Sequence, residues 1–449
     1  MPQTPLLEPR ATLVPAAEVA GRLAGLQAVL AARALDAALI VQNADLYYFS
    51  GTVQQSYLYV PAEGEATLFV RKLAERARLE SPLPALVELP SPRDLPALLA
   101  ERYGAVPARI GLELDVLPVN DYRRLQKLFP QAAFEDVGHD IVRLRAIKSS
   151  WEVERIRAAA AIADEVCGLI PGILREGLTE AEFAGKVEAE ARRLGHEGII
   201  RMRGFNQEMF YGQLLSGVSG TAASYLDTPL AGTGFSPAVA QGVSFKVIGR
   251  GEPVVFDFVP VREGYIADFT RMFVIGELPG ELRRAYEVAC HVQAAVAAAV
   301  RPGVTCRSVY ETALAAAAER GLAESFMGHG AGQVRFIGHG VGLELDELPV
   351  LAASDLELLP GMVFALEPKF VLPGLGAIGI ENTWLVTEAG LEKLTLAAES
   401  IHKVGWSPRE GEGYYVRATY RTVEQQEEKW RSSPGTCGSI ASAPRGFRR

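Results

Sequence analysis

The sequence is poor in cysteine and has no long uncharged apolar stretch. Its 449 residues include four cysteines, whose spacing fits neither a zinc ribbon nor a disulfide framework. We therefore expect free thiols, as in proteins of the cytoplasm. No apolar run reaches the roughly 18 residues that a membrane-spanning helix needs, so no membrane partner is expected.

The N-terminus and the charge exclude further classes. Residues 1–5 lack the basic start of a signal peptide, and no continuous apolar core follows them. The formal net charge is −9, from 54 acidic and 45 basic side chains. Such a chain has no general attraction for nucleic acid or anionic membranes. We expect a cytoplasmic protein that does not bind nucleic acid.

The first part of the chain alternates helical and β-rich segments. Apolar residues recur at helical spacing over residues 16–35. The alternation with β-rich runs predicts a small α/β domain over residues 1–145. The expected strands are 37–41, 56–60, 66–70 and 109–113.

A second domain is predicted over residues 146–403. Ser149 and Glu152 have the spacing of a capping box and begin a long helix, and a second capping box begins at Thr179. The run after this second helix, 196–202, is interpreted as a turn into a strand. Residues 404–449 are rich in Gly, Ser, Arg and Glu, and we expect a flexible tail there.

Two apolar strand pairs in the second domain each carry two carboxylates. If residues 253–273 fold about the Arg262–Glu263 bond, Asp257 lies opposite Asp268. Directly opposed residues hold their Cβ atoms about 5 Å apart. Two bare carboxylates at that distance repel each other and are costly to desolvate, so a bound cation is expected. The alternative is a salt bridge, for which Arg271 is available.

Residues 362–382 repeat this arrangement. Folding about Gly374 places Glu367 opposite Glu381, and His339 lies between two glycines on the segment between the hairpins. Carboxylates and imidazole suit Mn, Co, Zn or Fe. Bridging carboxylates would hold two ions about 3.5–4 Å apart, a separation that activates a shared water. The joint pattern favours a two-metal site over separate structural roles.

These motifs resemble those of the pita-bread metallopeptidases, which include methionine aminopeptidase, aminopeptidase P and prolidase. Residues 1–145 resemble the creatinase-type N-terminal domain of the prolidase and aminopeptidase P branch. The resemblance implies an α+β fold of two domains, a small α/β creatinase-like domain followed by a pseudo-twofold catalytic domain, and a homodimer. The matching runs are 264–271, 338–343, 366–368 and 380–382.

The resemblance also implies the chemistry. Two divalent ions (Mn, Co or Zn) would hold a bridging hydroxide as nucleophile, with Glu367 as the general base. The substrate would be an Xaa-Pro dipeptide or a short Xaa-Pro peptide. The implied metal ligands are Asp257, Asp268, His339, Glu367 and Glu381.

The sequence departs from the family pattern around these ligands. Asp346 stands where family peptidases carry a histidine, and Arg335 stands where aminopeptidase P has another. At the place of a third histidine of the family pattern, this chain has Ala240 and Gln241. At the place of an arginine of that pattern, it has Gly379. Because an oxyanion needs positive charge or donors aimed at it, substitutes are expected. The catalytic candidates are Asp346 and Arg335, which could also pair with each other, and the substrate-binding candidates are Lys369, Tyr211 and His329.

Two other functions stay open beside the peptidase. The altered surroundings favour a non-peptidase enzyme on the same fold, such as a C–N hydrolase or a lyase acting on a small metabolite. An inactive metal-holding module that binds a peptide is the third hypothesis. Restoration of hydrolysis by metal after chelation separates the three.

Overall fold

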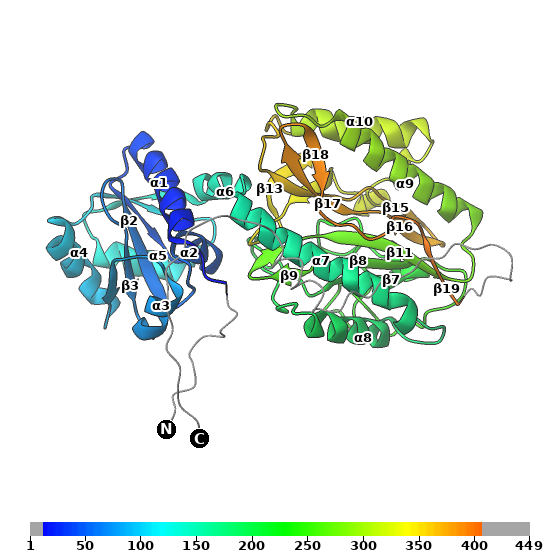
Figure 1. Ribbon diagram of the computed structural model, residues 1–449, viewed down its shortest axis with the longest axis horizontal. Helices are drawn as coiled ribbons and strands as arrows, with labels where there is room; N and C mark the ends of the chain where they lie inside the picture. The colour runs from blue at the N-terminus through cyan, green and yellow to red at the C-terminus, as the bar shows by residue number, and fades with distance from the viewer. Residues whose placement is uncertain (1–11, 406–449) are drawn as a thin grey trace, which may run out of the picture. The chain divides into compact units, whose positions relative to one another are not determined.

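The computed structural model describes residues 12–405, and every structural statement below concerns that part of the chain (Figure 1). The predicted tail lies outside the described residues from residue 406 onward, as does Cys437. The other three cysteines are free, as predicted. No helix among residues 12–405 is both long and apolar enough to cross a membrane.

The N-terminal part is a mixed six-stranded sheet with helices on both faces. The strand order is β4-β3-β2-β1-β5-β6, and β1 pairs antiparallel with β2 and parallel with β5. Since side chains alternate along a strand, Ile40 belongs to a buried cluster with Leu30 of α1, and Leu39 belongs to another, with Leu99 of α4, on the other face. All four strands expected here are present.

The elements of this part are α1 (Ala16–Ala32), β1 (Ala37–Ile40), α2 (Asn43–Ser50), β2 (Ser56–Pro61), β3 (Thr67–Val70), α3 (Ala74–Glu80), β4 (Leu86–Glu88), α4 (Leu95–Tyr103), β5 (Arg109–Leu112), α5 (Val119–Leu128), β6 (Ala133–Asp136) and α6 (Gly138–Ala146).

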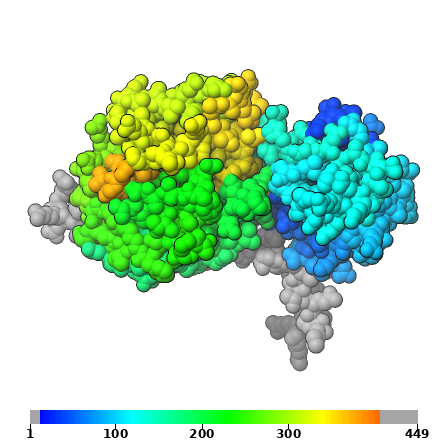
Figure 2. All heavy atoms as spheres, turned by 180° about the vertical axis from the view of Figure 1, so that it is seen from behind, coloured from blue at the N-terminus to red at the C-terminus, as the bar shows by residue number. Residues whose placement is uncertain are grey.

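Two helix pairs and two larger sheets form the rest of the described chain. Helices α7 and α8 pack against the sheet β19-β11-β8-β7, whereas α9 and α10 pack against the sheet β13-β12-β14-β17-β18 and the hairpin of β15 and β16 (Figure 1). We call the part built on α7 and α8 the first half and the part built on α9 and α10 the second half. Seen from behind, the second half (yellow) lies directly against the first half (green) (Figure 2). Each half combines two helices with a carboxylate-bearing hairpin, which agrees with the pseudo-twofold domain that the resemblance implies.

The elements of this part are α7 (Ser150–Ile173), α8 (Glu180–Arg193), β7 (Gly212–Ser216), β8 (Val254–Phe258), β9 (Val261–Arg262), β10 (Tyr265–Ile266), β11 (Phe269–Ile275), α9 (Gly280–Ala299), α10 (Cys306–Glu319), β12 (Phe336–Gly340), β13 (Glu347–Ala352), β14 (Val363–Leu366), β15 (Lys369–Leu372), β16 (Gly376–Gly379), β17 (Asn382–Thr387), β18 (Gly390–Lys393) and β19 (His402–Val404).

Both predicted capping boxes begin helices. The side chain of Ser149 accepts from the backbone N–H of Glu152 at the start of α7, and Thr179 does the same for Glu182 at the start of α8. Each glutamate in turn accepts from the backbone N–H of the capping residue. These reciprocal bonds satisfy N–H groups that have no partner within the helix.

The register predicted for the first hairpin is wrong by two residues. Asp257 lies opposite Thr270, not opposite Asp268. The reason is the turn: Arg262 pairs with Tyr265, which leaves Glu263 and Gly264 as a two-residue loop with φ values of 51° and 78°. Positive φ at both positions is typical of a type I′ turn, whose twist matches that of the strands.

The register predicted for the second hairpin is confirmed. Lys369 pairs with Gly379, and Leu372 pairs with Gly376. Continuing this pairing outward places Glu367 opposite Glu381, as folding about Gly374 predicts.

The strand predicted over residues 196–202 is wrong. Gly195 and Gly198 adopt positive φ and interrupt an extended chain. The ring of His196 instead bonds the carbonyl of Val259 and the N–H of Gly198, at 2.8 Å each, and so holds a loop. The strand in this region is β7, which pairs antiparallel with β8.

Candidate metal centre

The hairpins and strand β12 bring the predicted ligands to one small cavity of about 80 Å³. Strand β8 supplies Asp257, β12 supplies His339, and Asp268 directly precedes β11. Glu367 follows β14, and Glu381 precedes β17. Sequence positions more than a hundred residues apart therefore meet because two hairpins and one strand converge.

Three of these residues are arranged to hold one ion. Asp268, His339 and Glu381 each offer a ligand atom within 4.8 Å of the others. His339 Nδ1 lies 2.9 Å from the carbonyl oxygen of Leu345, and a carbonyl only accepts, so Nδ1 carries the proton and the lone pair of Nε2 faces the cluster. Nε2 lies 3.6 Å from Asp268 Oδ2. Glu381 Oε1 is buried without a hydrogen-bond partner among the described residues. These donors fit a single divalent cation.

Lys369 occupies the other side of the cluster. Its ammonium donates to Asp257 Oδ2 at 2.7 Å and to Glu367 Oε2 and Glu381 Oε2 at 2.9 Å each. The side chain is only 2% exposed. Three bonds use all three ammonium protons. The structure therefore places Lys369 among the candidate ligands, in the lining of the cavity, and its predicted role in substrate binding stays a prediction.

The cluster carries more negative charge than Lys369 offsets. Burial raises the pKa of Asp268 well above its usual range, and the charges of Glu381 and Asp257 raise it further. Burial also raises the pKa of Asp257, to about 6, although Lys369 opposes the shift. Carboxyl groups respond in this way when a compensating cation is missing, so these residues fit an additional positive ion.

The remaining predicted residues are divided between the cavity and the surface. Asp346 lines the cavity, with Oδ1 3.8 Å from His339 Nδ1. Arg335 is exposed, does not line it, and forms no ion pair within residues 12–405, so the expected pairing with Asp346 is absent. Tyr211 stacks on His196 at 4.3 Å. His329 is exposed, and neither it nor Tyr211 lines the cavity.

The cavity also exposes a residue that the sequence did not single out. Gln213 of β7 lies opposite Asp257 and is 3% exposed. Neither its amide nitrogen nor its amide oxygen has a hydrogen-bond partner among the described residues. Because an unsatisfied buried amide costs free energy, Gln213 is a candidate to bind a ligand that enters the cavity. The sequence could have pointed to Gln213 only if residues 212–216 had been predicted as a strand that pairs with the strand of Asp257.

Family models match most of the chain. The model described as metallopeptidase family M24 matches residues 154–388. The model described as the creatinase/prolidase N-terminal domain matches residues 22–147. The chain belongs to metallopeptidase family M24. Membership implies a divalent metal cofactor, and it confirms the predicted combination of a creatinase-like part and a pita-bread catalytic part.

Named relatives and solved structures agree with the M24 assignment. The chain is 32% identical to the Xaa-Pro dipeptidase of Pyrococcus horikoshii over 80% of this chain and 93% of that protein. The Xaa-Pro dipeptidase of Pyrococcus furiosus is 31% identical over the same shares. The structure of an Xaa-Pro dipeptidase from Bacillus anthracis matches with a TM-score of 0.73 and 25% identity, covering 86% of this chain and all of that one. This M24 chain is a prolidase-like enzyme.

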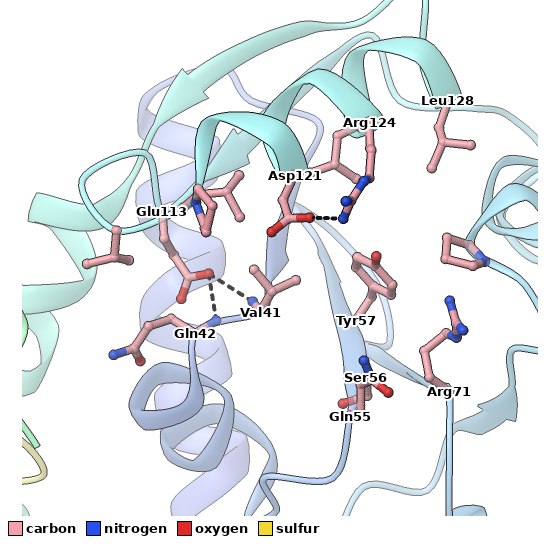
Figure 3. A pocket seen from close by; sticks show the side chains of 15 residues that line it. Val41, Gln42, Gln55, Ser56, Tyr57, Arg71, Glu113, Asp121, Arg124 and Leu128 are labelled. Carbon is pink, nitrogen blue, oxygen red and sulfur yellow. Dashed lines mark hydrogen bonds and ion pairs between the residues drawn. The ribbon is translucent and has the colours of Figure 1, made fainter.

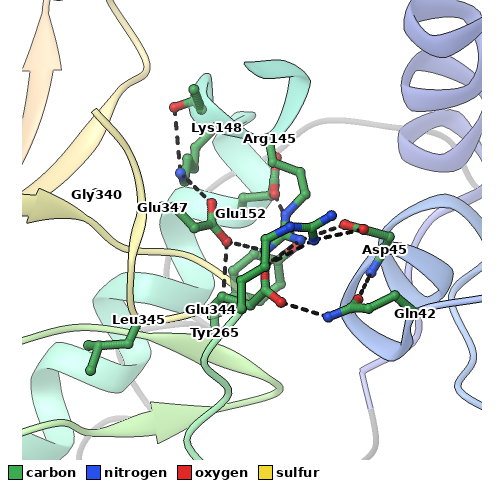
Figure 4. A network of polar contacts seen from close by, with 12 residues as sticks. Gln42, Asp45, Arg145, Lys148, Glu152, Tyr265, Gly340, Glu344, Leu345 and Glu347 are labelled. Carbon is green, nitrogen blue, oxygen red and sulfur yellow. Dashed lines mark hydrogen bonds and ion pairs between the residues drawn. The ribbon is translucent and has the colours of Figure 1, made fainter. Parts of the chain in front are cut away.

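A buried ionic network anchors the loop that follows the candidate ligand His339 (Figure 4). Arg145 pairs with carboxylates on both sides of Leu345, whose carbonyl orients the imidazole. The network therefore holds the acceptor that sets the direction of His339 Nε2. Its members are Asp45, Arg145, Lys148, Arg203, Glu344 and Glu347.

A separate cavity of about 390 Å³ lies within the N-terminal part of this M24 chain (Figure 3). Its wall includes Glu113, whose Oε2 accepts from the backbone N–H groups of Val41 and Gln42. It also includes an ion pair between Asp121 and Arg124. None of the candidate ligands lines this cavity. The candidate metal ligands therefore lie in the cavity of about 80 Å³, although the cavity in the N-terminal part is larger.

Proposed function

We propose that this enzyme is a metal-dependent peptidase that hydrolyses Xaa-Pro dipeptides or short Xaa-Pro peptides. The observation that carries the proposal is the set Asp268, His339 and Glu381, whose ligand atoms lie close together in the lining of one cavity. The similarity to two Xaa-Pro dipeptidases supports the same substrate class.

Asp268, His339 and Glu381 would hold the metal, for which Mn, Co and Zn are the candidates. When bound, the ion supplies Lewis-acid polarisation of the scissile carbonyl. Lys369 forms ion pairs with Asp257, Glu367 and Glu381, and so occupies part of the ligand set that the sequence assigned to two ions.

Glu367 is the proposed general base. Its Oε2 accepts from Lys369, while Oε1 lies 3.8 Å from His339 Nε2 at the cavity wall. The carboxylate takes the proton of the attacking water and delivers it to the leaving proline nitrogen. A positioned base of this kind contributes about 10²–10⁴-fold to the rate.

Gln213 and the acidic rim would bind the substrate. The unpartnered amide of Gln213 offers one donor group and one acceptor to the peptide. Glu208, Asp227 and Asp346 are exposed carboxylates that line the same cavity. Apart from Lys369 and His339, no described basic residue lines it. This charge pattern favours a substrate with a free, protonated amino terminus.

The test is hydrolysis of Xaa-Pro and Xaa-Ala dipeptides, and of their N-acetylated forms, by metal-stripped protein refilled with Mn, Co or Zn. We expect metal-dependent turnover that is selective for proline and for the free amine. Glu367→Gln should lower kcat about 100-fold or more, whereas Glu101→Gln, on an exposed face of α4, should not. Metal binding without turnover on any peptide would refute the peptidase proposal.

The position of Lys369 favours a second candidate, a non-peptidase hydrolase or lyase acting on a small metabolite. The ammonium of Lys369 pairs with Asp257 and Glu367, whereas the sequence predicts that these carboxylates bind two metal ions. Turnover of a small amide, with no peptide cleaved, would support it. A binding module without turnover is the remaining outcome.

Three expectations from the sequence stay predictions: the homodimer, the cytoplasmic location, and the domain limits at residues 145 and 403. Analytical sedimentation measures whether the protein is a homodimer. Limited proteolysis tests the domain limits, and we expect cleavage near residues 145 and 403.

A further inference from the structure

We propose that the Lys369 ammonium takes the place of one of two divalent cations, so that each chain binds a single metal ion through Asp268, His339 and Glu381. The inference rests on the proposed metal-dependent function. It concerns how many ions bind, which is measured without turnover.

The first argument is the hydrogen bonding of the ammonium. Lys369 Nζ has three protons, and three carboxylates accept them at 2.7 to 2.9 Å. Asp257 and Glu367, two of the expected metal ligands, are thereby engaged. A second divalent ion would need the same two carboxylate groups. It would then lie beside an ammonium in a buried site, where repulsion between cations is strongly felt.

The second argument is the space that the backbone leaves for this side chain. Lys369 pairs with Gly379 across the hairpin of β15 and β16. A Cβ atom at position 379 would lie 2.6 Å from Lys369 Cγ. The lysine stem therefore runs across a glycine that makes room for it, and its end is buried at the cluster. The absence of a side chain at Gly379 is part of how the ammonium reaches the carboxylates.

The third argument is the balance of buried charge. Asp257, Asp268, Glu367 and Glu381 provide at most four negative charges. One divalent ion together with the ammonium brings three positive charges, and two ions with the ammonium would bring five. An excess of buried positive charge is costly. One ion leaves the cluster with a net charge of −1, which one added proton balances, whereas two ions would leave +1, which only a further anion could balance.

The fourth argument is that the single-ion set remains complete beside the lysine. Glu381 offers Oε2 to Lys369 and keeps Oε1 without a described partner. His339 keeps its Nε2 lone pair toward Asp268, because the Leu345 carbonyl holds the proton on Nδ1. The ammonium thus occupies one half of the cluster and leaves the other half free for an ion.

The experiment is a count of bound metal. Purified protein is equilibrated with Mn or Zn, freed of unbound ion, and analysed for metal per chain by elemental analysis and calorimetric titration. We expect one ion per chain in the wild type and two in Lys369→Ala, which removes the ammonium and opens its place. Lys246→Ala removes a lysine paired with Glu252 outside the cavity and should keep one ion.

If Lys369→Ala does not fold, the number of ions bound to the wild-type protein still tests the proposal. Manganese bound to the wild type should give the electron paramagnetic resonance spectrum of an isolated ion, without the coupling of two adjacent ions. Two ions per wild-type chain, a coupled spectrum, or no bound ion would each overturn the inference. One bound ion without peptide hydrolysis would leave it standing and refute only the proposed substrate.

Discussion

Gln213 lies directly opposite Asp257 in the pairing of β7 with β8, and its amide has no hydrogen-bond partner within the described residues. We expect Gln213→Leu to lower kcat/KM about 100-fold, since one donor aimed at the substrate is lost. The same change should stabilise the fold by about 1 kcal/mol, because a buried unsatisfied amide is removed. Peptide kinetics and urea unfolding measure the two effects.

A matched control for this change is Gln131→Leu, at an exposed position. It should leave activity unchanged. Wild-type activity in Gln213→Leu would show that the amide does not meet the substrate, and a loss of stability would show that it has an unseen partner.

His339 offers the only imidazole lining the candidate metal centre among the described residues. His339→Gln should weaken binding of Mn or Zn at least about 100-fold, because losing a ligand costs at least as much as losing its supporting hydrogen bond. Titration calorimetry measures the affinity. His139→Gln changes an exposed histidine of α6 and should bind metal as the wild type does. Equal affinity in the two variants would exclude His339 as a ligand.

Gly379 leaves the space that the Lys369 stem occupies, and it stands where the pattern of the resembled family has an arginine. An added Cβ would lie 2.6 Å from Lys369 Cγ and 2.7 Å from the carbonyl oxygen of Pro368. We expect Gly379→Ala to destabilise the protein by about 1–3 kcal/mol through overpacking. Thermal unfolding measures the loss.

The comparison variant is Gly185→Ala, on an exposed face of α8, where a Cβ would meet nothing within 4 Å. It should stabilise the protein by about 0.5–1 kcal/mol, because alanine favours a helix interior. If both variants shift stability in the same direction, the close approach of Lys369 to Gly379 is not the cause.

Glu347 makes stability depend on pH at the acidic end. Although burial would raise its pKa, Arg145 and Lys148 lower that pKa to about 2. A carboxyl group with a depressed folded pKa stabilises the protein above its unfolded pKa, near 4.3, and this contribution is lost as the pH falls toward 2. It amounts to about 3 kcal/mol at neutral pH.

Glu347→Gln should therefore be less stable at pH 7 and should lose less stability between pH 4.5 and 2 than the wild type does. Urea unfolding across that range measures both curves. Glu88→Gln, at a position whose side chain is 67% exposed, should follow the wild-type profile. Parallel curves for the wild type and Glu347→Gln would contradict the assignment.

Local rules explain what could be predicted from the sequence. Ser149 and Thr179 marked helix starts because a capping box is complete within four residues. Gly374 marked the turn that sets Glu367 against Glu381, since a hairpin register follows from its turn. The first hairpin failed by two residues for the same reason, because its turn lies at Glu263 and Gly264.

The sequence by itself thus determined the capped helices, the presence of two hairpins, the register of the second, the family, and the set of carboxylates and histidine that gathers at the centre. Only the tertiary structure decided that Lys369 enters this cluster, that Gln213 faces it, and that Arg335, Tyr211 and His329 lie away from it. Capping and turn chemistry act over a few residues and can be recognised locally. Which side chains share a cavity depends on pairing between distant strands, and the chain fixes that pairing only when its whole core is packed.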